Sequence, residues 1–429
     1  MQNQKNISIQ NATSVIKNIK SGDHIFIHGA AATPNKLIQM LLDRSSELTD
    51  VTLYHLHTEG IVDYAKPEYK NSFKVRNLFV GANMRKLVDF DRVDYIPCFL
   101  SEIPSIFRNK KIKLDYAFIQ TSAVDKNGFV SLGTSVDVAK AAVLAATTVV
   151  AEINSQMPRT FGDGILSASQ IHGAIFTDQP IYQAGIKPLT DEEIAIGKHT
   201  ASLIEDGSCL QMGIGAIPNA VLNQLTSHKN LGLHTEMCSD GILPLLQSGV
   251  INNSQKKFHK DRSVCTFMIG SQNLYDYVHD NPSFTVLEAD YVNNPTIIAR
   301  NKKVVSINSA IEVDLTGQVC ADSIGPKIIS GVGGQIDYIR GASLSEGGKP
   351  IIAITSRTKK GISRIVPFLK EGAGVVTSRA HIHYVVTEYG VADLFAKSLG
   401  ERAHALIQIS HPEDRETLQR QWHEKYIAN

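Results

Sequence analysis

The sequence is poor in cysteine and has no long apolar run. Its five cysteines, an odd number without Cys-x-x-Cys spacing, argue against a disulfide framework and against a cysteine zinc site. The longest apolar stretch, residues 138–153, contains Lys140 and is rich in alanine. It is too short and too polar to span a bilayer, so we expect a buried helix that runs into a strand, and no membrane partner.

Neither sign of charge is in excess. The chain has 43 basic and 42 acidic residues, a balance that gives no electrostatic basis for binding nucleic acid or an anionic membrane. Residues 1–14 are polar and lack the basic-then-apolar pattern of a secretory signal. The sequence therefore predicts a cytoplasmic protein whose partner is a small molecule. A homodimer, the commonest assembly, is the expectation for oligomeric state.

Several signatures of catalysis are missing as well. The sequence has no Gly-x-Ser-x-Gly elbow, no P-loop and no catalytic-cysteine signature. The loop QMGIGAIPNAV, residues 211–221, is not a dinucleotide fingerprint, because Pro218 stands where the third glycine belongs. It does follow a strand-like run and open a helix-like one. That context favours either an anion-binding turn or a plain tight turn.

Two further motifs each leave an alternative open. The glycine cluster SGVGGQIDYIRGASLSEGG, residues 330–348, has Gly331, Gly333 and Gly334 before a short strand-like stretch. It either lets backbone approach a ligand closely or forms a flexible surface loop. The pair His55 and His57 suggests a metal hydrolase, but no matching ligand set follows at a known spacing, so we interpret it as structural.

The two halves of the sequence repeat one pattern. Each half has an acidic or serine-glycine turn, a short strand, a small-residue loop and a Pro-Asn pair that opens a helix. Val- and Ile-rich runs alternate with amphipathic segments throughout, which predicts mostly parallel sheets covered by helices. We therefore expect two tandem α/β domains related by internal duplication, residues 1–187 and 188–429. The collinear matches are 19–41 with 204–225, 79–88 with 268–278, and 124–133 with 313–322.

A carboxylate stands where a strand gives way to a helix in the second half. Glu236 lies in HTEMCSDG, residues 234–241, between an apolar-polar alternation and an amphipathic run. Such junctions open on the ligand-binding edge of an α/β sheet. Glu236 is the best-placed reactive group, and a cap for the following helix is the alternative interpretation.

Six ordered motifs together resemble the acetyl-CoA hydrolase/transferase family, specifically its 4-hydroxybutyrate CoA-transferase branch. They are GIGAIPNAV, HTEMCSDG, VNNP, INSAIEVDLTGQV, GVGGQIDYIRGA and VTEYGVADL, with MPRTFGDG (157–164) in the first half. The resemblance implies two tandem CoA-transferase domains, with Glu236 as catalytic glutamate and Asn293 as an active-site asparagine. It also implies CoA or oxyanion contacts by Gly213, Ile214, Gly215, Ala216, Ile217, Ile311 and Gly334.

The implied chemistry needs no metal and no permanently bound cofactor, because coenzyme A is a substrate. Glu236 forms a mixed anhydride and then a glutamyl-CoA thioester in a ping-pong exchange. Acetyl-CoA with 4-hydroxybutyrate or butyrate is the expected pair, and His234, Met237 and Cys238 are expected to wall the site. A hydrolase on the same scaffold and a non-catalytic acyl-CoA-binding protein are the alternatives.

Overall fold

The computed structural model describes residues 9–185, 188–213 and 215–428. The chain divides into two compact units, Met1–Gly185 with Cys265–Tyr291, and Ile186–Val264 with Val292–Asn429. The division into 1–187 and 188–429 stays a prediction, and the first stretch of unit 1 ends slightly earlier, at Gly185. Residues 265–291 belong with the first unit.

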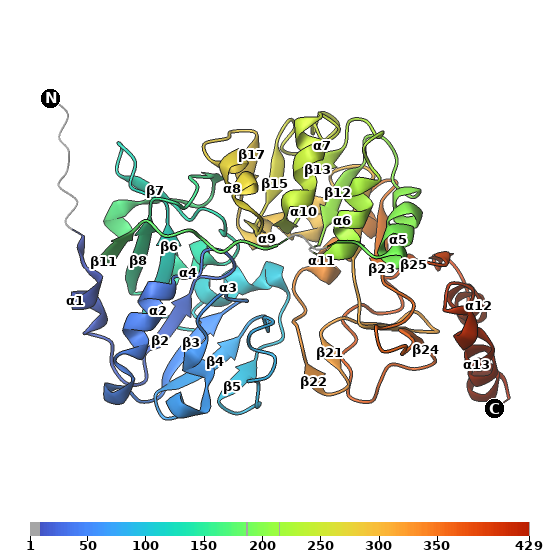
Figure 1. Ribbon diagram of the computed structural model, residues 1–429, viewed down its shortest axis with the longest axis horizontal. Coiled ribbons are helices and arrows are strands. Elements are labelled where there is room, and N and C mark those ends of the chain that lie inside the picture. Colours follow the sequence, from blue (N-terminus) through green and yellow to red (C-terminus); the bar gives the residue numbers. More distant parts are fainter. Residues whose placement is uncertain (1–8, 186–187, 214, 429) are drawn as a thin grey trace. The chain divides into compact units, whose positions relative to one another are not determined.

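Unit 1 is built on a parallel sheet of eight strands (Figure 1). Its central strands are buried on both faces, as in β6, where all six residues are buried. This is the pattern of a parallel sheet covered on both sides. Across the sheet the strands are β1 (Gln10–Asn11), β11 (Gly173–Thr177), β8 (Thr148–Asn154), β6 (Tyr116–Thr121), β2 (His24–Ile27), β3 (Val51–His55), β4 (Phe73–Asn77) and β5 (Val93–Tyr95).

Helices cover this sheet in pairs, α1 beside α2 and α3 beside α4. The apolar stretch 138–153 forms α4 and runs into β8, which confirms the buried helix and strand predicted there. The remaining elements of unit 1 are α1 (Ala12–Ile16), α2 (Asn35–Leu42), α3 (Ile103–Arg108), α4 (Ala139–Ala145), η1 (Ser45–Glu47), η2 (Asp63–Ala65), η3 (Pro67–Tyr69), η4 (Leu100–Glu102), η5 (Ala168–Gln170), β7 (Phe129–Ser131), β9 (Phe161–Gly162), β10 (Ile165–Ser167), β16 (Phe267–Met268), α8 (Gln272–Val278) and β17 (Phe284–Val286).

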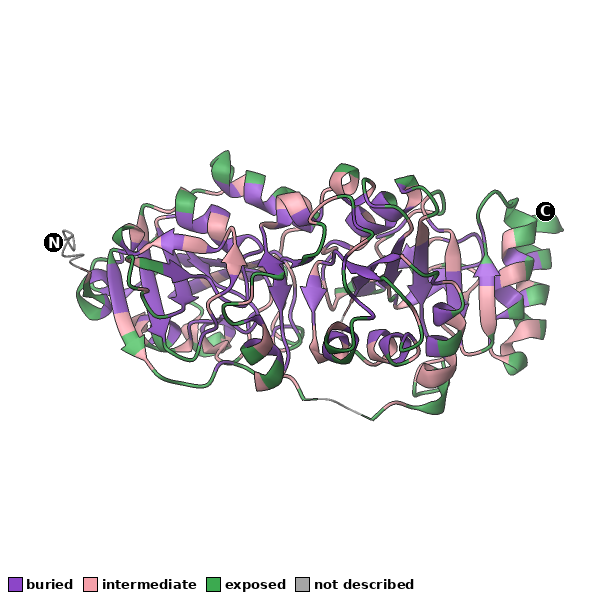
Figure 2. Ribbon diagram, turned by 90° about the horizontal axis from the view of Figure 1, so that it is seen from above, coloured by how far each residue is buried: buried purple, intermediate pink, exposed green. Residues whose placement is uncertain are grey.

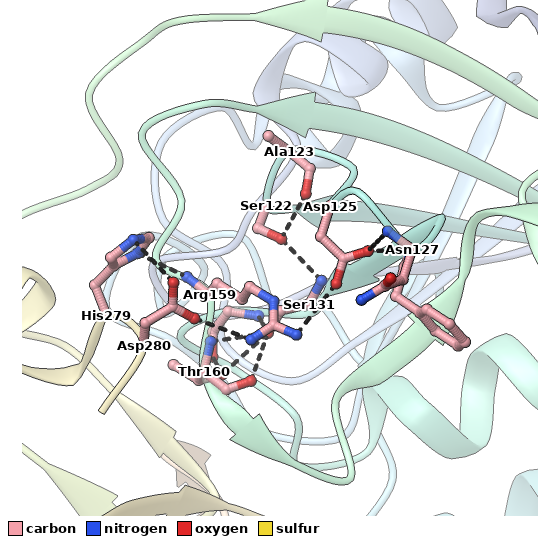
Figure 3. Close-up of polar contacts among 11 residues, drawn as sticks. Ser122, Ala123, Asp125, Asn127, Ser131, Arg159, Thr160, His279 and Asp280 are labelled. Atoms are coloured by element: carbon pink, nitrogen blue, oxygen red, sulfur yellow. Dashed lines mark hydrogen bonds and ion pairs between the residues drawn. The ribbon is translucent and has the colours of Figure 1, made fainter. Parts of the chain in front are cut away.

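An arginine holds the returning segment 265–291 to the rest of unit 1 (Figure 3). The Arg159 guanidinium donates to Asp280 at 2.9 Å and to Asp125 at 3.2 Å. The Arg159 backbone N–H donates to Nδ1 of His279 at 3.1 Å, and its carbonyl accepts from the Asp280 N–H at 2.8 Å. Arg159 of the motif MPRTFGDG therefore anchors the segment 265–291 to unit 1. A division of the chain at one boundary does not include this segment in the first domain.

Unit 2 is built on a six-stranded sheet that is parallel except for its last pair. The strands across it are β13 (Gly232–Leu233), β12 (Cys209–Met212), β18 (Val304–Asn308), β23 (Lys349–Ala353), β25 (Tyr384–Thr387) and β26 (Gly390–Asp393). Five consecutive strands match unit 1, because β13-β12-β18-β23-β25 follows the same chain order as β3-β2-β6-β8-β11. This shared order confirms the predicted pair of α/β units.

Local sequence explains the first helix of unit 2. In α5 (Asp191–Ala201), the Thr190 side chain accepts from the Glu193 N–H and the Glu193 side chain accepts from the Thr190 N–H. This reciprocal cap satisfies two donors that a helix start otherwise leaves open. Gly197 lets α5 approach α6 (Ala216–Asn223), since a Cβ there would lie 2.6 Å from the carbonyl oxygen of Ala220.

The expected strand after Gly334 is wrong. Residues Gln335–Leu344 form the helix α11, because Tyr338, Ile339 and Ala342 are spaced by one, three and four positions and are buried on one face. The other elements are η6 (Asp240–Ile242), α7 (Leu243–Gln247), α9 (Ala289–Val292), α10 (Pro295–Ile298), α12 (Leu399–Gln408), α13 (Pro412–Trp422), the π-helical turn η7 (His423–Ile427), β14 (Met237–Cys238), β15 (Ser263–Cys265), β19 (Glu312–Asp314), β20 (Val319–Cys320), β21 (Ser323–Ile324), β22 (Lys327–Ile328) and β24 (Ile365–Val366).

Each unit encloses its own buried sheet, and exposed residues lie mainly on helix surfaces and loops (Figure 2). Within the described part of the chain, no helix combines the length and apolar character needed to cross a membrane.

Candidate active site

The carboxyl ends of β12, β13 and β18 form the edge of unit 2 on which a ligand site is expected. The chain first adds β13 on one side of β12 and later adds β18 on the other, so the order reverses between β12 and β18. Gln211 near the end of β12 and Asn308 at the end of β18 exchange side-chain hydrogen bonds of 3.4 and 3.2 Å there. Open α/β sheets bind ligands at such a reversal point.

Glu236 lies at this edge, three residues beyond the end of β13. Thr235 fixes the backbone before it, because its hydroxyl accepts from the Met212 N–H at 3.1 Å and lies 3.0 Å from the Met212 carbonyl oxygen. The next α-helix, α7, begins only at Leu243 and has Ile242 at its N-cap. Glu236 is therefore not a cap of that helix, and its side chain is partly exposed.

Two residues from later segments meet the Glu236 carboxylate. Nδ2 of Asn293, between α9 and α10, donates to Oε2 of Glu236 at 2.7 Å. A Cβ added at Gly334, the N-cap of α11, would overlap both that carboxylate oxygen and that amide nitrogen. Only glycine fits this close approach of backbone to the carboxylate. The structure thus brings together Glu236, Asn293 and Gly334.

The loop 213–217 begins directly beside this group. It follows Met212, which is hydrogen-bonded to Thr235, and leads into α6. Gly215 has φ +110, a left-handed conformation that a side chain would strain, and it is exposed. Ala216 and Ile217 form the first turn of α6, while Ile214 lies outside the described residues.

Ile311 lies on the loop between β18 and β19. Its N–H donates to the Cys320 carbonyl at 2.8 Å. Gln335, at the start of α11, donates to the Ser309 carbonyl at 2.8 Å. This bond ties the loop that carries Ile311 to the helix that follows Gly334.

The floor beneath Glu236 is buried and holds two titratable groups. Burial, helped by the charge of Lys256, lowers the pKa of His234 to about 3. Burial also lowers the pKa of Lys256 to about 8. The Lys256 ammonium donates to the carbonyls of Leu233 at 2.8 Å and Arg262 at 2.6 Å. His234 is thus a buried, neutral imidazole, and its place in the wall of the site stays a prediction.

Sequence reasoning missed Lys256, and no local signal marks it. It is one of two adjacent lysines in a polar stretch, which is typical of an exposed loop. Its stem is buried because Gly232 leaves room for it, since a Cβ at that glycine would lie 2.7 Å from the lysine Cγ.

The structural interpretation of His55 and His57 stays a prediction, which the contacts of His55 support. In His55, Nδ1 donates to the Leu56 carbonyl and Nε2 lies 3.3 Å from the Tyr64 hydroxyl, so both ring nitrogens have protein partners. Over the described residues, no group of three or more metal-binding side chains lies close enough to hold an ion.

The geometry supports covalent chemistry by a carboxylate. One oxygen of Glu236 is oriented by an amide donor, and backbone without a side chain leaves a close approach beside it. A carboxylate held in this way can act as a nucleophile toward an acyl carbonyl.

Comparisons with known proteins agree with this geometry. Residues 2–185 match the acetyl-CoA hydrolase/transferase N-terminal domain and residues 270–422 match its C-terminal domain. A succinyl-CoA:acetate/propanoyl-CoA:succinate CoA transferase of Fasciola hepatica is 50% identical over 94% of this chain and 85% of its own. A 4-hydroxybutyrate coenzyme A transferase of Clostridium kluyveri is 46% identical over 99% of this chain and 98% of its own.

A solved structure shares the fold over nearly the whole chain. The 4-hydroxybutyrate CoA-transferase of Porphyromonas gingivalis has a TM-score of 0.84 and 37% identity, and the match covers 97% of this chain and 98% of that one. A protein named acetyl-CoA hydrolase, from Kluyveromyces lactis, is more distant, at 26% identity over 78% of this chain and 72% of its own.

Proposed function

This chain belongs to the acetyl-CoA hydrolase/transferase family, and on that premise we propose that it is a CoA-transferase whose nucleophile is Glu236. It moves CoA from a short-chain acyl-CoA to a carboxylic acid. The observation that carries the assignment of the nucleophile is the meeting of Glu236 with Asn293 and Gly334, three residues far apart in the chain.

The first half-reaction makes and breaks two acyl bonds. A carboxylate oxygen of Glu236 attacks the thioester carbonyl, and collapse of the tetrahedral oxyanion expels the CoA thiolate and leaves a mixed anhydride. The thiolate then attacks the glutamyl carbonyl carbon, which releases the donor acid as a carboxylate and leaves a glutamyl-CoA thioester. A second acid runs these steps in reverse and leaves as its acyl-CoA.

Asn293 and Gly334 serve both steps in this proposal. The Asn293 amide orients the attacking carboxylate, and the Gly334 N–H donates to the developing oxyanion. Removing one such donor costs about 100- to 1,000-fold in related acyl transfers. The contact around Gly334 is too tight for a side chain, which supports a role for bare backbone at this place.

Coenzyme A contacts are proposed for Gly213, Ile214, Gly215, Ala216, Ile217 and Ile311. The start of the 213–217 loop beside Thr235 supports the loop's part in this assignment, because CoA bound along it would lead toward Glu236. No permanently bound cofactor takes part. A cytoplasmic homodimer remains the proposal for location and assembly.

The acids exchanged are proposed from the relatives' names. Acetyl-CoA with 4-hydroxybutyrate or butyrate is the preferred pair, and the Clostridium kluyveri relative supports 4-hydroxybutyrate. A hydrolase, in which water intercepts the glutamyl intermediate, is less favoured because the relative with that name is more distant. A non-catalytic acyl-CoA-binding protein is disfavoured by the geometry around Glu236.

The test is the half-reaction without an acceptor acid. Wild-type protein incubated with acetyl-CoA should release one equivalent of acetate and carry CoA as a thioester that peptide mass mapping locates on Glu236. Glu236→Gln should bind acetyl-CoA and form no adduct. An adduct on another residue would overturn the assignment of the nucleophile, and steady release of free CoA with no transfer to a second acid would make the protein a hydrolase.

A further inference from the structure

One backbone carbonyl under the site accepts two side-chain hydrogen bonds. The carbonyl oxygen of Val292 lies 2.8 Å from Nε2 of His234 and 3.2 Å from the hydroxyl of Tyr338. Both atoms donate, because a carbonyl oxygen has no proton to give. His234, Val292 and Tyr338 are all buried, at 2%, 0% and 0% exposure.

The three residues come from the three segments that carry the site. His234 precedes Glu236 by two positions, and Val292 directly precedes Asn293. Tyr338 lies one turn into α11, where its N–H donates to the Gly334 carbonyl at 3.1 Å. The segments that carry Glu236, Asn293 and Gly334 are therefore joined at one acceptor, the Val292 carbonyl.

We propose that His234 and Tyr338 are positioning residues that act together through the Val292 carbonyl to hold Glu236, Asn293 and Gly334 in register. We call these three residues, His234, Val292 and Tyr338, the Val292 clasp. The proposal rests on the proposed function, because it assigns a role in that reaction. The hydrogen bonds of both donors go to the Val292 carbonyl, so we assign them a positioning role and no step of the reaction.

The three site residues need to be held in place because the distances between them leave little room for movement. Asn293 and Glu236 are 2.7 Å apart, and Gly334 has no room for even a methyl group beside them. A shift of about 1 Å in a positioned reaction can cost roughly 100-fold in rate. Val292 ends α9, and α9 and α10 have only four residues each, so neither helix is long enough to fix the Asn293 loop by itself.

The chemical state of His234 suits this part. Burial keeps the imidazole neutral, so a single ring proton is available, and the Val292 carbonyl places it on Nε2. Nδ1 has no hydrogen-bond partner among the described residues, so the ring is held by this one bond and by packing. Its centroid lies 6.4 Å from that of the Tyr338 ring, which puts the two donors side by side.

Matched variants separate the clasp from general packing. His234→Met keeps volume but removes the donor, whereas His234→Gln can place an amide N–H near the position of Nε2. Tyr338→Phe removes only the hydroxyl. The controls also lose a ring or hydroxyl donor to a backbone carbonyl: His228→Met, whose Nε2 lies 3.1 Å from the Ile204 carbonyl, and Tyr275→Phe, whose hydroxyl donates to the Tyr182 carbonyl at 2.7 Å.

The expected signature is a loss in kcat at constant KM for acetyl-CoA. His234→Met should lower kcat about 10-fold and Tyr338→Phe about 3-fold, since each removes one hydrogen bond. The double variant should fall about 100-fold, beyond the product of the two, because only then is the carbonyl released. His234→Gln should recover to within about 3-fold of wild type, and the controls should stay within about 2-fold.

Hydrogen-deuterium exchange supplies a readout that needs no activity. Amides of peptides covering residues 289–298 should exchange about 10-fold faster in the clasp variants and not in the controls. Equal exchange in clasp and control variants overturns the clasp, as does a double variant whose kcat loss is merely the product of the singles. If wild type forms no CoA adduct, the proposed function fails, and the exchange comparison still decides whether the clasp exists.

Discussion

The tripeptide His-Thr-Glu occurs twice, at the same place in both units. Residues 57–59 follow β3 and residues 234–236 follow β13, and these strands hold equivalent positions in their sheets. Glu59 is thus the counterpart of Glu236 in unit 1. The two glutamates share a place in the duplicated fold and differ in what surrounds them.

The partners of Glu59 all come from unit 1. Its N–H donates to the Thr33 hydroxyl at 3.0 Å, and its carbonyl accepts from Nδ2 of Asn35 at 3.2 Å. Burial raises the pKa of the Glu59 carboxyl, although a hydrogen bond from Tyr182 acts in the opposite direction. Glu236 instead meets Asn293 and Gly334, which later segments deliver. The same fold position therefore carries a carboxylate in both units, and in unit 2 later segments bring Asn293 and Gly334 to it.

Replacing each glutamate by glutamine should show the largest difference between Glu236 and Glu59. Glu236→Gln should lower CoA transfer by about 10⁴-fold or more, because the proposed nucleophile is lost. Glu59→Gln should keep the CoA adduct on Glu236 and retain transfer within about 10-fold, because the hydrogen bonds of Glu59 to Thr33 and Asn35 are made by its backbone and are kept. Stopped assays of CoA transfer and intact-protein mass measure both effects.

Equal losses in the two variants would contradict the distinction. So would an adduct that moves to Glu59 when Glu236 is replaced, since that would make both positions reactive. Circular dichroism of each variant should match the wild-type spectrum, which guards against loss through unfolding.

Alanine substitutions at two glycines without room for a Cβ, one beside each glutamate, test the comparison further. Gly334→Ala should lower kcat by roughly 100- to 1,000-fold, because its Cβ would displace the Glu236 carboxylate and the Asn293 amide. Gly60→Ala would also meet a side chain, at 2.5 Å from Oδ1 of Asn35, and its φ of +96 strains any Cβ. It should cost about 1–3 kcal/mol of stability and leave adduct formation intact.

The measurements are single-turnover adduct formation and urea unfolding. If Gly60→Ala abolished the adduct while folded, or Gly334→Ala reacted at the wild-type rate, the close approach at Gly334 would have no part in catalysis.

The position of Glu236 was predictable because strand, loop and helix are encoded next to one another in the chain. The repeat of 19–41 at 204–225 gave the fold, and the junction after β13 gave the carboxylate. Its partners were named only through the family motifs, since Asn293 follows Glu236 by 57 positions and Gly334 lies farther on. Local periodicity contains no information about which segments meet at one sheet edge.

Two stretches differ from the arrangement predicted from sequence, and both differences have physical reasons. The run after Gly334 has β-branched and aromatic residues typical of a strand, but packing of Tyr338, Ile339 and Ala342 on one face makes it a helix. Residues 265–291 leave their neighbours in sequence for unit 1, where Arg159 pairs with Asp280. Both outcomes depend on long-range contacts, which override local preference.

An asparagine stands beside each glutamate, and removing each tests what it does. Asn293→Ala should lower kcat about 10- to 100-fold, because the carboxylate loses its orienting donor at 2.7 Å. Asn35→Ala loses bonds to the Glu59 carbonyl and the Ile61 N–H at 2.9 Å. It should destabilise the protein by about 1–2 kcal/mol with kcat unchanged. Equal kcat losses from both variants, measured at saturating acetyl-CoA, would count against a specific role for Asn293.

The smallest expected effect concerns acid stability, and it compares one buried histidine in each unit. Burial lowers the pKa of His55 to about 4 and that of His234 to about 3, against about 6.5 unfolded. The unfolded chain therefore binds more protons, so each group's stability contribution is complete above pH 6.5 and is lost as pH falls toward 4 or 3. The slope is about 1.4 kcal/mol per pH unit for each histidine.

The single tryptophan, Trp422, lies buried in α13 of unit 2 and reports the unfolding of that unit. Between pH 6.5 and 4.5, His234→Gln should flatten the pH dependence of the urea unfolding followed by Trp422 fluorescence, because one proton-binding difference is gone. His55→Gln should leave the pH dependence of the Trp422 transition unchanged. It should flatten the pH dependence only of the unfolding of unit 1, which circular dichroism detects and Trp422 fluorescence does not. If His55→Gln changed the Trp422 transition as much as His234→Gln does, the two units would unfold as one, and their difference would be confined to chemistry at the two glutamates.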